Sequence, residues 1–120
     1  MEITDNDAVA IRTSIESQLE AFQRDDAETA FAFASEGIQE QFQTPDNFMW
    51  MVKKSYPAVY RPRSVFFEKL TTVQGSVTQP VLLLAPDGTP RRALYLMERE
   101  VDGNWKINGC LIVSVETEII

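Results

Sequence analysis

The chain has 120 residues, 44% of them hydrophobic and 24% charged, and a chain of this size buries roughly two-thirds of the surface that its unfolded form exposes. One globular domain over residues 1–120 is therefore expected. Eighteen acidic against eleven basic side chains give a net charge of −7, which disfavours binding to nucleic acid and to anionic membrane surfaces.

The sequence contains one cysteine, Cys110, and no histidine. An intramolecular disulfide and the usual zinc and iron ligand sets are therefore excluded, and we expect neither a metal nor a cofactor. The first residues are neither basic nor followed by an apolar run, and no apolar run is long enough to span a bilayer. These features predict a cytoplasmic protein.

Apolar residues spaced three and four apart predict that the first half of the chain is helical. Asp5, Asn6 and Asp7 can cap a first helix of about five turns. Its apolar face consists of Ala8, Ile11, Ile15, Leu19 and Phe22.

A short second helix follows, capped by Asp25 or Asp26. Gly37 is expected to end it as the C′ residue in the left-handed conformation. One further turn over 38–42 precedes the third helix. The apolar positions of the second helix are Ala27, Ala30, Phe31 and Ala34.

Thr44 and Pro45 predict the start of the third helix, because proline at the first helical position loses no hydrogen bond. Tyr56 should end it, because a residue that precedes proline disfavours the α conformation. Phe48, Met49 and Val52 share one face of this helix.

From Arg63 the apolar period changes to two, which predicts four antiparallel strands. Asp87-Gly88 and Asp102-Gly103 predict two-residue type I′ hairpin turns, with both residues at positive φ, and Gly75-Ser76 is a further turn candidate. Pro80 indicates an edge position or a bulge in the second strand. The expected fold is α+β, with three helices followed by a four-stranded meander.

The last strand, which begins at Trp105, is apolar on one face and also carries Cys110 and Ile112 on the other. In the third strand, Leu94 and Leu96 likewise lie opposite the face that holds Tyr95. Because three helices cover only one face, we expect a homodimer through the second face, and a strongly curled sheet is the alternative. The residues expected on the core side of the last strand are Trp105, Ile107, Leu111, Val113 and Val115.

A helix-rich first half followed by hairpins that end in Asp102-Gly103-Asn104-Trp105-Lys106-Ile107-Asn108-Gly109 resembles the NTF2-like superfamily, which includes cystatin-like, SnoaL-type and ketosteroid-isomerase-type proteins. Within it, the chain is most similar to the bacterial domain of unknown function DUF4864, from about residue 8 to residue 112. The resemblance to DUF4864 is carried by Phe48, Tyr56-Pro57, Pro62, Asp87-Gly88, Ala93, Tyr95 and the run from Asp102 to Cys110.

The resemblance implies a cone, in which a curved sheet wraps around the helices and a cavity opens between them. In this superfamily such cavities hold small molecules, host isomerase or dehydratase chemistry, or are filled in proteins that serve association. The DUF4864 family implies no activity. The sequence lacks the short strand that many members carry between the second and third helices, which implies a small cavity.

An isomerase-like site needs a buried base and a group that stabilises an oxyanion. Tyr95 offers a hydroxyl, but Glu98 lies an odd number of residues away and should point to the opposite face of its strand. Glu68 is expected to face water. No catalytic residue is assigned.

Two other kinds of site are considered. An aromatic set can line a small-ligand pocket or simply fill the core, and its members are Trp50, Tyr56, Tyr60, Phe67 and Tyr95. Arginines at strand starts can bind an anion or remain solvated, and these are Arg61, Arg63, Arg91 and Arg92.

The sequence therefore predicts a non-catalytic module that binds a small apolar or anionic ligand or another protein. The alternative is a small enzyme of isomerase or hydratase type that uses the cone cavity. The thiol of Cys110 is expected to be packed at the dimer interface, since only Lys106 offers a nearby positive charge.

Overall fold

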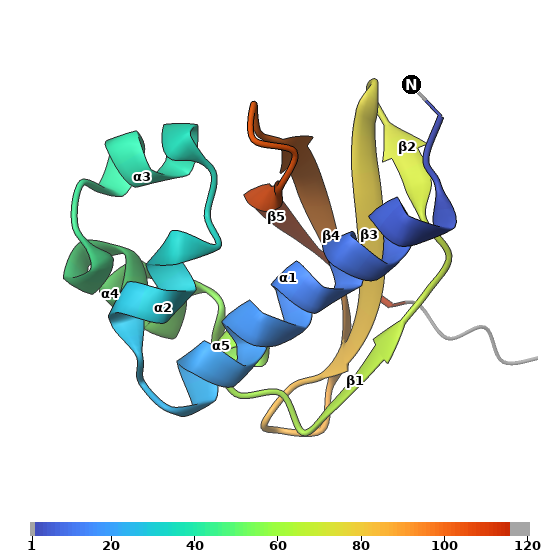
Figure 1. Ribbon diagram of the computed structural model, residues 1–120. Coiled ribbons are helices and arrows are strands. Elements are labelled where there is room, and N and C mark those ends of the chain that lie inside the picture. Colours follow the sequence, from blue (N-terminus) through green and yellow to red (C-terminus); the bar gives the residue numbers. More distant parts are fainter. Residues whose placement is uncertain (1, 116–120) are drawn as a thin grey trace, which may run out of the picture.

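The computed structural model describes residues 2–115 as an α+β fold in which five helices pack beside one open antiparallel sheet of five strands (Figure 1). In Figure 1, α1 crosses in front of the sheet, and α2, α3 and α4 lie on the side of β5. The elements are α1 (Asp5–Gln23), α2 (Ala27–Ala32), α3 (Glu36–Phe42), α4 (Pro45–Ser55), α5 (Pro57–Tyr60), β1 (Ser64–Phe67), β2 (Thr71–Val73), β3 (Ser76–Leu84), β4 (Pro90–Arg99) and β5 (Trp105–Ser114).

The first helix forms as predicted, but its cap is Thr4, which precedes the three residues expected to cap it. Thr4 and Asp7 form a capping box, in which Thr4 Oγ1 accepts from the Asp7 amide at 3.1 Å and Asp7 Oδ2 accepts from the Thr4 amide at 3.0 Å. Asp7 Oδ1 also accepts from Trp105 Nε1 at 3.2 Å, which joins the start of α1 to the start of β5. The apolar face of α1 is fully packed, because Ile11 and Ile15 are both 0% exposed.

The prediction for the end of the second helix is wrong. Asp26 caps α2, but the helix ends at Ala32, and Gly37 lies inside α3 rather than after α2. The cause is a long-range pairing: the Ser35 amide donates to the Ile107 carbonyl, and the Ile107 amide donates to the Phe33 carbonyl, both at 2.9 Å. These bonds to β5 hold the linking residues extended, so Ser35 can cap a separate helix.

The predicted third helix is confirmed as α4, with Thr44 as its cap and Pro45 as its first residue. Tyr56 ends it, as expected. The chain then turns once more as α5, because Pro57 takes the first helical position of a new turn. The same proline therefore ends one helix and begins the next.

The sheet has the order β1-β3-β4-β5, and β2 pairs with β3 on the same side as β1. The predicted first strand is thus two strands with a break between Phe67 and Thr71. Pro80 lies opposite this break, in a central strand, so its expected edge position is wrong. The Pro80 carbonyl accepts from the Glu68 amide at 3.0 Å. Proline has no N–H to donate, but its nitrogen faces the same break between β1 and β2, so the sheet loses no hydrogen bond there.

The two Asp-Gly turns form at the predicted places with a different geometry. Gly88 and Gly103 have φ of +86° and +89°, but neither preceding aspartate has a positive φ. The Asp102 side chain instead accepts from the Asn104 amide at 2.9 Å, which stabilises a longer loop closed by a left-handed glycine. The two-residue turn with positive φ at both positions lies between β2 and β3, at Gln74 and Gly75.

The largest correction concerns the last strand. Leu96 pairs with Gly109 and Met97 pairs with Ile107, so Asn108 is an extra residue that forms a β-bulge. A one-residue insertion moves every following side chain to the other face. Cys110 and Ile112 therefore join Trp105 and Ile107 against the helices, and the expected placement of both residues on a dimer face is wrong.

Leu111 and Val113 consequently point away from the core, where they are 50% and 38% exposed. We call this side the outer face of the sheet and the side toward the helices the inner face. Leu94 and Leu96 lie on the outer face, as predicted, and are partly exposed. The apolar outer-face residues are Phe66, Leu82, Leu84, Leu94, Leu96, Leu111 and Val113.

Within residues 2–115, no helix combines the length and the apolar character that are needed to cross a membrane.

Candidate functional site

A cavity of about 290 Å³ lies between the helices and strands β4 and β5. Its wall is almost entirely apolar, with a few polar tips. The apolar wall includes Phe22, Ala34, Ile38, Phe42, Phe48, Met51, Val52, Val59 and Ile107, and the polar groups come from Gln18, Gln41, Tyr56, Tyr95 and Cys110.

Phe48 organises the helical wall of this cavity. Its ring centroid lies 6.1 Å from that of Phe22, 5.6 Å from that of Phe31 and 5.7 Å from that of Phe42. These rings come from four helices or helix ends, and their tilted and edge-on contacts are the favourable geometries for aromatic pairs. Phe48 and Val52, from the helical face that the sequence predicts for α4, thus form part of one side of the cavity.

Tyr95 forms the floor of the cavity from the inner face of β4. Its side chain is 1% exposed, and its hydroxyl has no hydrogen-bond partner among residues 2–115. Burial, together with the neighbouring Cys110, raises the pKa of Tyr95 well above its ordinary value. The hydroxyl is therefore protonated at neutral pH.

Cys110 lies directly across from Tyr95 in the β4–β5 ladder. Burial raises the pKa of its thiol to about 12, so the thiol is protonated and a poor nucleophile. The Cys110 carbonyl accepts from the Tyr56 hydroxyl at 3.3 Å, and burial also raises the pKa of Tyr56. Gln18 is fixed as well, because its Nε2 donates to the Ala30 carbonyl at 3.0 Å.

The cavity runs from a buried floor to an exposed rim. Gln18, Phe22 and Tyr95 are buried, whereas Gln41 on α3 is exposed and Gly109 on β5 is partly exposed. All residues of α3 are at least partly exposed, and Ile38 and Phe42 pack against the edge of the core, so this helix covers the rim. The opening therefore lies between α3 and the bulged strand.

The structure brings together only two of the five aromatic residues predicted to line a pocket. Tyr56 and Tyr95 lie in the cavity wall. Trp50 is 64% exposed and lines a second, more open hollow, which adjoins the cavity because Gln41, Phe42 and Met51 line both. Phe67 packs at the inner face of β1 under the guanidinium of Arg12, away from the cavity.

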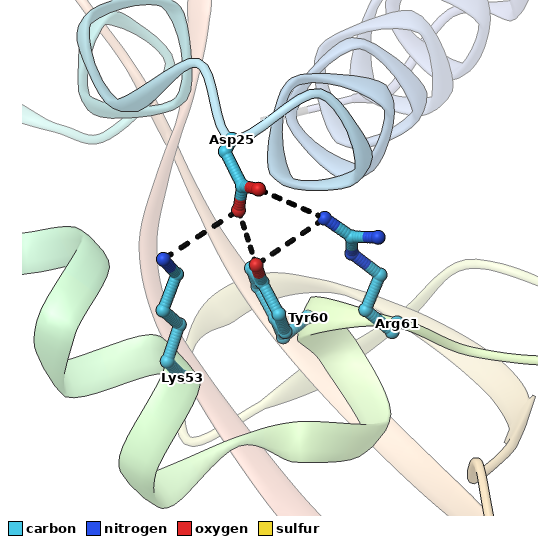
Figure 2. Close-up of polar contacts among 4 residues, drawn as sticks. All are labelled: Asp25, Lys53, Tyr60 and Arg61. Atoms are coloured by element: carbon cyan, nitrogen blue, oxygen red, sulfur yellow. Dashed lines mark hydrogen bonds and ion pairs between the residues drawn. The ribbon is translucent and has the colours of Figure 1, made fainter.

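Tyr60 belongs to a surface cluster centred on Asp25 (Figure 2). The Tyr60 hydroxyl donates to Asp25 Oδ1, Arg61 Nη2 lies 3.1 Å from Oδ2, and Lys53 Nζ lies 3.6 Å from Oδ1. The hydrogen bond from Tyr60 and the two positive charges lower the pKa of Asp25. The cluster ties the α1–α2 turn to α4 and α5 and so holds the helical wall in place.

The four arginines predicted as an anion site do not share one location. Arg61 is paired with Asp25 on the helical side, and Arg92 is paired with Glu68 in a two-bond arrangement at 2.7 and 3.0 Å. Arg91 donates to the Pro90 carbonyl, and the guanidinium of Arg63 lies beside Gly88.

The two strand carboxylates considered as bases lie away from the cavity. The ion pair with Arg92 lowers the pKa of Glu68, and Glu98 is exposed on the face opposite to Tyr95. This placement of Glu98 agrees with the expectation from strand alternation. Sequence reasoning did not assign Gln18, Phe22, Phe48 or Val52 to a site, because a core face and a cavity wall have the same helical spacing.

A family model described as a domain of unknown function, DUF4864, matches residues 4–120. No curated protein and no solved structure matches the chain.

Proposed function

Since the chain belongs to the DUF4864 family, a domain of unknown function, we propose its role from its own geometry: it binds a small, largely apolar molecule in the cavity between the helices and β4–β5. One observation carries this proposal. This domain keeps a cavity of about 290 Å³ that opens at its rim and has a mainly apolar wall with a few polar groups, which is the usual character of a small-molecule site. An apolar occupant would recover the contacts that the wall lacks.

The size and charge of the cavity restrict the class of ligand. Small-molecule sites usually have volumes from roughly 300 Å³ upward, so this space suits a molecule of one or two rings. The wall within residues 2–115 contains no aspartate, glutamate, lysine or arginine. A charged ligand would lose its hydration there without gaining a partner of opposite charge.

The same wall favours binding over the alternative of an isomerase or hydratase. Proton abstraction needs a base within hydrogen-bond reach of the substrate. Glu68 is engaged by Arg92, and Glu98 points to solvent from the opposite face. The hydroxyls and the thiol of the cavity have raised pKa values and hold their protons.

We retain the NTF2-like cone as the proposed superfamily architecture. Helices against one face of an antiparallel sheet, with a cavity between the two layers, support this proposal. The small size of the cavity agrees with the absence of a strand between α2 and α4 in the described part of the chain.

The binding proposal is tested with indane, a neutral bicyclic hydrocarbon, titrated into the protein by calorimetry or ligand-observed NMR. We expect saturable binding by the wild type. Ile38→Trp should weaken it at least tenfold, because Ile38 lines the cavity and the larger ring would occupy it. Val9→Trp, at a position 65% exposed on α1, is the matched control and should leave binding unchanged. Failure of indane to bind, or equal binding by Ile38→Trp, would refute the proposal.

The outer face of the sheet supports a second proposal, that two copies associate through it. Phe66 is 65% exposed there, next to the partly exposed leucines of β3 and β4. Phe66→Asp is expected to shift the protein from dimer toward monomer in sedimentation at micromolar concentration, because a charge would enter an apolar interface. Val9→Asp is the control on the helical side. A wild-type protein that sediments as a monomer would exclude this dimer.

A further inference from the structure

We propose that the ligand of this cavity carries a neutral, hydroxylated ring of the glycoside class, and that this ring binds in the open hollow beside Trp50. The inference rests on the proposed binding function and specifies the part of the ligand that extends beyond the apolar cavity.

The hollow is a second space, of about 480 Å³, on the surface of α3 and α4. Its volume lies within the usual range of small-molecule sites. Gln41, Phe42 and Met51 line both the hollow and the cavity, so the two spaces meet at the C-terminal end of α3. Gln41 is exposed at this junction. A ligand held in the cavity can therefore extend past Gln41 into the hollow.

Trp50 gives the hollow an aromatic surface that is held in place. It is 64% exposed, and Lys54 Nζ lies 4.6 Å from its ring centroid, which is the distance of a cation–π contact. Lys54 does not line the hollow, so the ammonium group covers one part of the indole and leaves another part open to the hollow. An exposed indole combines an apolar ring with a polar surrounding, and it suits the carbon-bound hydrogens on one face of a sugar ring.

The polar groups of the hollow are the side-chain amides of Gln41, Gln43 and Asn47. An amide contains both hydrogen-bond donors and an acceptor, and a hydroxyl group likewise donates and accepts. A carboxylate only accepts and an ammonium group only donates, so neither would use all of these groups. The described residues that line the hollow include no aspartate, glutamate, lysine or arginine that could balance a charge. A neutral ring with several hydroxyls therefore matches the hollow.

The link between α3 and α4 is strained where it borders the hollow. Gln43 has a φ of +71°, which is unfavourable for a residue other than glycine. The Thr44 amide donates to the Phe42 carbonyl at 2.8 Å across this residue, and Asn47 Nδ2 donates to the same carbonyl at 3.0 Å. Residues in such conformations are concentrated at ligand sites. The two bonds hold the Gln43 backbone and the Asn47 amide in place, so this amide needs little ordering when a ligand binds.

The experiment compares three molecules that share the indane skeleton: 2-indanol, its glucoside, and its glucuronide, which has a carboxylate in place of one hydroxymethyl group. In calorimetry, the wild type should bind the glucoside about tenfold tighter than 2-indanol, and the glucuronide more weakly than the glucoside. Trp50→Ala should bind the glucoside and 2-indanol equally, and Gln43→Ala should lose part of the preference. Gln23→Ala, which removes an exposed glutamine that lines neither space, is the matched control.

Two further measurements test whether one ligand occupies both spaces. Trp50 is 64% exposed and Trp105 is 3% exposed, so iodide should quench mainly the fluorescence of Trp50. The bound glucoside should reduce this quenching, whereas bound 2-indanol should not. Ile38→Trp, which fills the cavity, should weaken the binding of the glucoside as well as that of 2-indanol.

The outcomes separate this inference from the proposed function. Equal affinity of the wild type for the glucoside and 2-indanol would overturn the inference and leave the proposed function intact. The same holds for a glucoside preference that survives in Trp50→Ala, for glucuronide binding as tight as glucoside binding, and for iodide quenching that the glucoside leaves unchanged. Undiminished glucoside binding by Ile38→Trp would exclude a ligand that spans both spaces. Binding of neither 2-indanol nor the glucoside would overturn both proposals.

Discussion

Replacing Phe48 with alanine is expected to lower the free energy of unfolding by about 4 kcal/mol. The Phe48 side chain is 6% exposed and contacts the rings of Phe22, Phe31 and Phe42. Its removal would take away the contacts that hold α2, α3 and α4 together and would extend an existing cavity. Urea denaturation monitored by circular dichroism measures this loss. Trp50→Ala on the same helix, where the side chain is 64% exposed, should cost less than about 1 kcal/mol.

The Phe48→Ala variant should also bind indane in a larger space. A ligand that binds only the folded state raises stability by RT ln(1 + [L]/Kd), so the variant should recover part of its lost stability when indane is added. We expect this gain in stability to exceed that of the wild type at the same concentration of indane. The reason is that loss of the Phe48 ring enlarges the cavity, so indane fits with fewer steric contacts. A variant stabilised no more than the wild type would contradict the placement of Phe48 in the cavity wall.

The parts of the fold that could be predicted are those set by neighbouring residues. Thr44 and Pro45 fix the start of α4, and Tyr56 before Pro57 fixes its end, because capping and proline geometry act within a few residues. The boundary between α2 and α3 was missed because it depends on hydrogen bonds from Phe33 and Ser35 to Ile107. A local pattern contains no information about such a partner.

The site was predicted only in part for a related reason. Tyr56 and Tyr95 were assigned to a pocket, and both lie in the cavity wall, but Trp50 and Tyr60 carry the same aromatic signal and lie elsewhere. The sequence indicates only that an aromatic side chain is a candidate for burial. Whether that side chain lines the cavity depends on how the helices pack against the sheet. The free hydroxyl of Tyr95 is visible only once every neighbouring acceptor has a position.

The bulge at Asn108 shows how one residue can invert a prediction from alternation. Odd-numbered positions from Trp105 onward have an apolar period with one gap, at Gly109, which predicts Leu111 in the core and Cys110 outside. The structure inserts Asn108 between two paired segments, and its Oδ1 accepts from the Ser35 hydroxyl at 2.7 Å. The link between α2 and α3 thus contacts the bulge and favours the register that places Cys110 inside.

Deleting Asn108 is therefore expected to have a larger effect than any substitution in this strand. Without the extra residue, either Trp105 and Ile107 or Cys110 and Ile112 must leave the inner face, and each large side chain lost from a core costs about 2–5 kcal/mol. We expect the deletion variant either to unfold or to expose Cys110 in a shifted register. Circular dichroism distinguishes these two states.

The thiol of Cys110 reports the change of register directly. In the wild type it lies on the inner face with a pKa of about 12, so a thiol-specific reagent such as dithionitrobenzoate should react slowly. In the deletion variant the reaction should be at least tenfold faster, because the thiol gains solvent and its pKa falls toward the ordinary value. Asn108→Asp retains the chain length and an acceptor for Ser35, and should keep the thiol protected. A deletion variant with wild-type stability and a protected thiol would show that the register of β5 does not depend on the bulge.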